Sequence, residues 1–160
     1  MQGIAFRPGA AFNGQPFTAE HGPNHSDEVT PLVPGGNAGW DPKDRPSLEC
    51  PGDYCGYSGT PATMPMTDTE RFPDAMLPAW VWQGEARGMG PAEFLNGSQW
   101  GEWDGQLVVG LMADMSIYKL DLDDNGNATD ATKVPVRCCT SWTCSFVLRI
   151  FCLIDCSTGV

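Results

Sequence analysis

The sequence predicts an all-β protein built from antiparallel sheets. Its apolar segments are short and rich in β-branched and aromatic residues, and turns of Gly, Asn and Asp separate them. The composition points the same way, because 19 Gly and 14 Pro in 160 residues favour many turns over long helices. With 41% hydrophobic residues, the chain has enough apolar side chains for one domain with a packed core.

The N-terminal part predicts three strands. Residues 2–6 are apolar and bounded by turn residues, so we expect a short buried strand with residues 17–20 as its hairpin partner. Residues 29–33 form the third expected strand. Pro31 and Pro34 favour an edge position for it, because proline lacks the N–H that a central strand donates.

The middle of the chain predicts a long loop followed by a run of strands. Residues 41–78 are rich in Pro, Gly and Thr, show little periodicity and contain no obvious helix. The DNGN sequence at residues 124–127 predicts a hairpin turn after a cleanly alternating strand. The strands expected after the loop are residues 79–83, 91–95, 106–111 and 116–122.

Seven cysteines fall into two groups. Cys50 and Cys55 flank a turn that brings two sulfurs together in an oxidising compartment. Zinc binding is the alternative for this spacing, but a second pair of ligands with matching spacing is missing. The other five cysteines crowd the last stretch, residues 138–160, which has no turn chemistry. We expect this stretch to be an aberrant tail, and an odd total leaves at least one thiol unpaired.

Charge and hydropathy exclude several partners. A net charge of −11 argues against nucleic acid, whose phosphates require a basic face. The N-terminus carries no basic and apolar leader, so no signal peptide is expected in this chain. The longest apolar run, residues 146–154, is interrupted by Arg149 and is too short to span a membrane.

The candidate site lies in residues 19–40. The turn His21-Gly22-Pro23 is built from residues that fix an irregular backbone and can aim main-chain carbonyls at a cation. Asp27 adds a carboxylate a few residues later, and Ca²⁺ prefers such a mixture of carbonyl and carboxylate oxygens. The simpler alternative is a β-hairpin with a polar loop.

Several motifs in this region resemble soluble PQQ-dependent glucose/sorbosone (aldose sugar) dehydrogenases. They are residues 2–6 (QGIAF), 20–23 (EHGP), 27–28 (DE) and 35–40 (GGNAGW, with Ala38 where the family commonly has Tyr). A later pattern, Trp-x-Gly-x-Leu-x-Val-Gly followed by Leu-Asp-Leu-Asp and Asn-Gly, fits the same family.

The resemblance covers residues 2 to 137 and carries expectations about fold and activity. It implies a six-bladed β-propeller, of which this chain would hold about two blades as a C-terminal fragment, followed by the tail. The implied reaction is oxidation of a sugar at its anomeric carbon, with PQQ held on Ca²⁺ as electron acceptor. A periplasmic or extracellular location is implied as well.

The resemblance also assigns site residues. The main-chain carbonyls of Gly22 and Pro23 and the carboxylate of Asp27 correspond to Ca²⁺ ligands. Gln2 corresponds to a glutamine that contacts PQQ, although a strand-end amide that binds backbone groups explains Gln2 equally well. Met112 stands where the family carries a Lys that pairs with a PQQ carboxylate, and an uncharged thioether cannot replace that charge.

No catalytic residue is assigned. The family's general base is a His on an earlier blade, and the only histidines here are His21 and His25 in the turn, of which His25 is expected to be a solvated loop residue. We therefore expect the chain alone not to oxidise sugars. Two alternatives are a non-catalytic propeller-like binding protein and an EF-hand-like calcium module at residues 121–132. The second is weakened because Thr132 stands where the loop needs a bidentate Glu.

Overall fold

The structure, a computed structural model, describes residues 3–22, 25–39, 67, 69 and 72–135. These residues form two four-stranded antiparallel sheets and two short 3₁₀ helices, so the predicted all-β class is confirmed. The first sheet contains β1 (Gly3–Phe6), β2 (Pro16–Glu20), β3 (Glu28–Pro31) and β4 (Trp80–Val81). The second contains β5 (Met89–Phe94), β6 (Leu107–Leu111), β7 (Ser116–Leu122) and β8 (Ala128–Lys133), and the 3₁₀ helices are η1 (Ala10–Phe12) and η2 (Ser98–Trp103).

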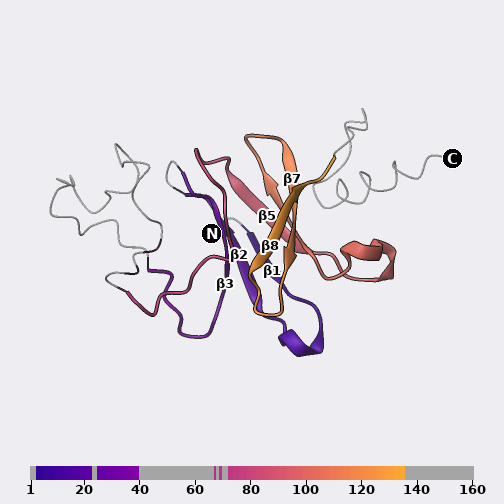
Figure 1. Cartoon of the computed structure of the whole chain (residues 1–160), viewed down its shortest axis with the longest axis horizontal. Coiled ribbons are helices and arrows are strands. Elements are labelled where there is room, and N and C mark those ends of the chain that lie inside the picture. Colours follow the sequence, from indigo (N-terminus) through magenta and orange to yellow (C-terminus); the bar gives the residue numbers. More distant parts are fainter. Residues whose placement is uncertain (1–2, 23–24, 40–66, 68, 70–71, 136–160) are drawn as a thin grey trace.

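Each sheet is a meander in which strands that follow one another in sequence lie side by side (Figure 1). Two such meanders are the expected form of two propeller blades. The turn between β7 and β8 closes with hydrogen bonds from Asp123 N to Asn127 O (2.9 Å) and from Gly126 N to Asp123 O (3.0 Å). Gly126 has a φ of 86°, which glycine adopts at little cost. The hairpin turn predicted at residues 124–127 is therefore confirmed.

The two sheets share one hydrophobic core. Strands β1 and β2 pack against β5, the first strand of the second sheet. The backbones approach so closely that a Cβ built on Gly3 would lie 2.3 Å from the carbonyl oxygen of Gly90, so only glycine fits in β1 at this point. The buried core residues are Ala5, Phe17, Ala19 and Val29 from the first sheet and Met89, Phe94, Leu107, Val109, Leu111 and Leu120 from the second.

A half-buried aromatic cluster packs against this core. Trp80 of β4, Trp82 just after it and Tyr118 of β7 form it, with ring centroids 5.4 to 6.1 Å apart. The cluster joins the last strand of the first sheet to the second sheet. A backbone hydrogen bond from Ala128 N to Ala79 O (3.1 Å) reinforces the same junction.

The edge position predicted for the third strand is wrong. Strand β3 pairs with β2 on one side and with β4 on the other. The proline is tolerated because the β3–β4 ladder covers only Glu28 and Val29, so Pro31 at the strand end faces no β4 donor or acceptor.

Other differences are local. Strand β5 begins at Met89, with a register irregularity before Ala92, and β8 was not among the expected strands. In the described residues the only helices are η1 and η2, and neither has the length or the apolar character needed to cross a membrane. Trp40, the cysteines and the predicted tail at residues 138–160 lie outside the described residues.

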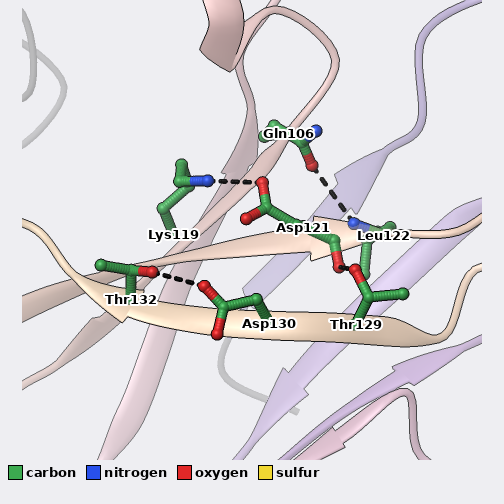
Figure 2. Close-up of polar contacts among 7 residues, drawn as sticks. All are labelled: Gln106, Lys119, Asp121, Leu122, Thr129, Asp130 and Thr132. Atoms are coloured by element: carbon green, nitrogen blue, oxygen red, sulfur yellow. Dashed lines mark hydrogen bonds and ion pairs between the residues drawn. The ribbon is translucent and has the colours of Figure 1, made fainter.

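The EF-hand-like alternative is wrong. The acidic residues of segment 121–132 lie on the strands β7 and β8 and in their turn, not between two helices. Figure 2 shows their contacts: Asp121 pairs with Lys119 of the same strand, and Asp130 accepts a hydrogen bond from Thr132 (2.7 Å). The hydroxyl of Thr129 donates to the main-chain carbonyl of Asp121 across the β7–β8 pair (3.0 Å).

Candidate functional site

The site is built around the turn between β2 and β3. Gly22 is buried there, and a Cβ built on it would lie 1.6 Å from the carbonyl oxygen of His25. The turn is thus folded so tightly that residue 22 has no room for a side chain. Ser26, with a φ of 57°, returns the chain toward β3. The predicted irregular backbone is confirmed for the described part of the turn.

Asp27 connects this turn to the second sheet. Its side chain is fully buried (0% exposed), and Oδ1 accepts a hydrogen bond from Gly22 N (2.9 Å). Oδ2 accepts two, from Arg87 N (2.7 Å) and from Met89 N (3.0 Å). Trp82 N also donates to the main-chain carbonyl of Asp27 (2.8 Å). One residue therefore binds the turn, the segment after β4 and the start of β5.

These contacts bear on the expected Ca²⁺ site. Both carboxylate oxygens of Asp27 already accept N–H groups inside the protein, which argues against a direct ligand role for this side chain. Main-chain carbonyls of the turn remain suitable donors for a hard cation. Within the described ranges, no group of three or more His, Cys, Asp or Glu side chains could hold a metal ion. The ligand role of Gly22 stays a prediction, while Pro23 and Gln2 lie outside the described residues.

His25 is not the solvated loop residue that the sequence suggested. It is only 4% exposed and forms an isolated β-bridge with Glu85. Its Nδ1 lies 2.8 Å from Ser26 Oγ, and its Nε2 is buried without a hydrogen-bond partner. The expectation failed because burial here depends on the segment after β4, which is distant in sequence.

Glu28, the neighbour of Asp27, is a buried carboxyl on β3. It is 4% exposed, and its Oε2 has no hydrogen-bond partner. Burial, and secondarily the charge of Glu20 directly opposite on β2, raise the pKa of Glu28 to about 7 from its ordinary value of 4.5. Asp27 and Glu28 are therefore both buried carboxyls. The side chain of Asp27 accepts three hydrogen bonds, whereas one oxygen of Glu28 has no hydrogen-bond partner.

Met112 lies beside the turn. A Cβ built on Gly88 would lie 3.5 Å from both His21 Cε1 and Met112 Cε, so these two side chains flank Gly88. Met112 donates its N–H to the carbonyl of Gly88 (3.1 Å), and its side chain is 58% exposed. The position expected to carry a cation in this family is therefore a solvent-accessible thioether next to the candidate turn. The nearby Arg87 pairs with Asp114 (3.6 Å).

In this geometry, the buried carboxylate of Asp27 joins the two sheets, and the tight turn at Gly22 lies near Met112. Residues 1–138 match the family described as Glucose / Sorbosone dehydrogenase. The chain is 26% identical over 136 residues to the uncharacterized protein slr1608 of Synechocystis sp., covering 85% of this chain and 29% of that protein.

Solved structures give the same result. A crystal structure of a glucose dehydrogenase aligns with a TM-score of 0.60 and 26% identity, over 84% of this chain and 34% of that one. The PQQ-bound aldose sugar dehydrogenase of Streptomyces coelicolor, at 17% identity and a TM-score of 0.50, shares the fold over 83% of this chain and 29% of its own. This chain thus spans about a third or less of the length of these relatives, and it belongs to the glucose/sorbosone dehydrogenase family.

Proposed function

We propose that this chain is part of a PQQ-dependent sugar dehydrogenase that oxidises an aldose at its anomeric carbon. The observation that supports this most is the family match over residues 1–138, a range that includes the tight turn at Gly22. The family gives the class of reaction, and the turn gives this chain a place where main-chain oxygens can meet a cation. The PQQ-bound relative from Streptomyces coelicolor motivates the choice of cofactor.

In this proposal the carbonyls of Gly22 and Pro23 bind Ca²⁺, and Gln2 contacts PQQ. Bound PQQ would supply a two-electron acceptor, with Ca²⁺ as a Lewis acid. The described residues contribute orientation: the Asp27 carboxylate holds the backbone at Gly22 and keeps that segment inside the protein. Asp27 itself, expected from the resemblance to be the third ligand, is better suited to this supporting task.

Among the described residues we assign no general base. His25 is buried against Ser26, and His21 is half-buried beside Gly88, so we assign the role of general base to neither. Losing a general base costs about 10²–10⁴ in rate. We therefore propose that the 160-residue chain alone does not turn over aldoses.

The remaining assignments are proposals of the same kind. Residues 1–137 would form one partial propeller unit and residues 138–160 a separate tail. The substrate would be a small sugar, with neither nucleic acid nor membrane as partner, and the location periplasmic or extracellular. A second candidate function, a propeller-like binding protein without catalysis, is favoured by the exposed Met112 thioether, which cannot pair with a cofactor carboxylate.

Binding of PQQ to the purified chain tests the proposal, measured by fluorescence titration with Ca²⁺ and again with EGTA. We expect Ca²⁺-dependent binding that Met112→Lys tightens about two- to fivefold, because an exposed ion pair is worth about 0.5–1 kcal/mol. Met115→Lys is the matched control: it adds the same charge three residues away on a side chain that is 90% exposed. We expect it to leave the affinity unchanged.

Absence of Ca²⁺-dependent PQQ binding in both the original chain and Met112→Lys would refute the cofactor assignment. A dye-reduction assay with aldoses on the PQQ- and Ca²⁺-loaded chain tests the second part. Turnover by the chain alone would contradict the proposed inactivity. PQQ binding without turnover would agree with both parts.

A further inference from the structure

We propose that Asp27 is a positioning residue, whose buried carboxylate clamps the Gly22 turn to the start of β5, and that it is not a metal ligand. The importance of the turn for cation binding rests on the proposed function. The clamp itself does not, because it is defined by three hydrogen bonds within the protein.

The three donors come from both sheets. Gly22 follows β2 in the first sheet, whereas Arg87 and Met89 lie just before and at the start of β5 in the second. Hydrogen bonds of 2.9, 2.7 and 3.0 Å to one carboxylate fix these two segments relative to each other. A carboxylate suits this task because it only accepts, and N–H bonds to it are stronger than bonds to a neutral acceptor.

The clamp also sets the direction of the neighbouring carbonyls. In a trans peptide the C=O and N–H point in opposite directions, so the Gly22 N–H aimed at Asp27 turns the carbonyl of His21 away from it. The same rule at Met89 turns the carbonyl of Gly88 away from Asp27, and that carbonyl accepts the N–H of Met112 (3.1 Å). Asp27 thereby orients the backbone of the candidate site without facing a ligand.

A direct ligand role fits the geometry poorly. Two carboxylate oxygens offer about four lone-pair sites, and the backbone donors occupy three of them. The fourth, on Oδ1, is enclosed, because the side chain is 0% exposed. A cation would have to displace these N–H groups, and the residues Gly22 and Met89 that carry two of them are buried.

The variant Asp27→Asn tests the positioning role of Asp27. Asparagine has the same shape but only one acceptor oxygen, so its NH₂ group must face at least one of the three N–H donors. We expect the bond to Gly22 or the pair to Arg87 and Met89 to be lost. Glu28→Gln is the matched control, since it neutralises the next buried carboxyl without touching the clamp.

The experiment is amide hydrogen exchange by NMR on the full chain in EGTA, with no PQQ and no metal. We expect Gly22, Arg87 and Met89 to be protected in the original chain and in Glu28→Gln. In Asp27→Asn at least one of them should exchange ten or more times faster, while Val109 in β6 keeps its rate. Rapid exchange of all three in the metal-free original chain, or unchanged protection in Asp27→Asn, would overturn the proposal.

A second measurement needs no variant and covers the case in which Asp27→Asn does not fold. Scalar couplings across the hydrogen bonds, from the ¹⁵N of Gly22, Arg87 and Met89 to Asp27 ¹³Cγ, should be present without Ca²⁺ and persist when Ca²⁺ is added. Couplings that vanish on Ca²⁺ addition would make Asp27 a ligand and overturn the assignment. Failure of the chain to bind Ca²⁺ or PQQ would refute the proposed function but leave these couplings in place.

Discussion

Replacing Glu28 by Gln should make the protein more stable at alkaline pH and remove part of its pH dependence. The Glu28 carboxyl is 4% exposed on β3, between Glu20 of β2 and Val81 of β4. Burial and the opposing Glu20 charge raise its pKa from 4.5 to about 7, although a hydrogen bond from Thr30 acts in the other direction. Glutamine keeps the shape and has no charge to bury.

The direction of the pH effect on stability follows from how tightly Glu28 binds a proton in the folded and the unfolded chain. Between pH 4.5 and 7 the folded Glu28 holds a proton that the unfolded chain has released, so folding becomes less favourable as pH rises through this window. One pKa unit is worth about 1.4 kcal/mol, so the raised pKa of Glu28 gives a loss of about 2–3 kcal/mol between pH 5 and pH 8. Below pH 4.5 both states are protonated and the effect is absent.

Urea denaturation at pH 5 and pH 8 measures this difference. The original chain should lose about 2–3 kcal/mol more free energy of unfolding than Glu28→Gln over that interval. Glu20→Gln, which removes the lesser cause, should lose an intermediate amount. The same substitution at the exposed Glu102 should follow the original chain. Equal pH dependence in Glu28→Gln and the original chain would refute the reasoning, because Glu28 would then be ionised in the fold at no cost.

Three further predictions concern packing. Phe17→Ala should lower the free energy of unfolding by about 3–5 kcal/mol in urea denaturation, because Phe17 is 0% exposed and packs edge-to-face on Phe94 (5.3 Å); a loss below 1 kcal/mol would contradict this core assignment. Gly3→Ala should lower the thermal midpoint by several degrees, since its Cβ would meet the backbone oxygen of Gly90 at 2.3 Å, and an unchanged midpoint would mean that β1 and β5 are not in contact. Arg7→Met should cost about 1–3 kcal/mol in the same urea assay, because the guanidinium donates to the β7–β8 turn (2.7 Å) and lies 3.6 Å over an aromatic ring; no change would indicate that this link is weak.

Short-range sequence patterns were enough to predict the fold class, most strands and the family. Strand and turn preferences act over a few residues, so QLVVGL at residues 106–111 and DNGN at residues 124–127 could be assigned without tertiary information. The family motifs are likewise local, and they lie within residues 1–138, which match the family. Strand β8 was missed because its ATDATK sequence has little apolar alternation, and it is a strand only because it pairs with β7.

The roles of the polar residues in the turn depend on tertiary contacts that the sequence does not show. Asp27 reads in sequence as a loop carboxylate available to a cation, yet its oxygens bind N–H groups of Arg87 and Met89, about sixty residues away. His25 is likewise buried beside the segment after β4, and Glu28 is buried between β2 and β4. Burial and hydrogen-bond satisfaction depend on which distant backbone groups approach, and no short-range pattern encodes that approach. The carbonyl-rich turn could therefore be found from sequence, but the carboxylate that holds it in place could not.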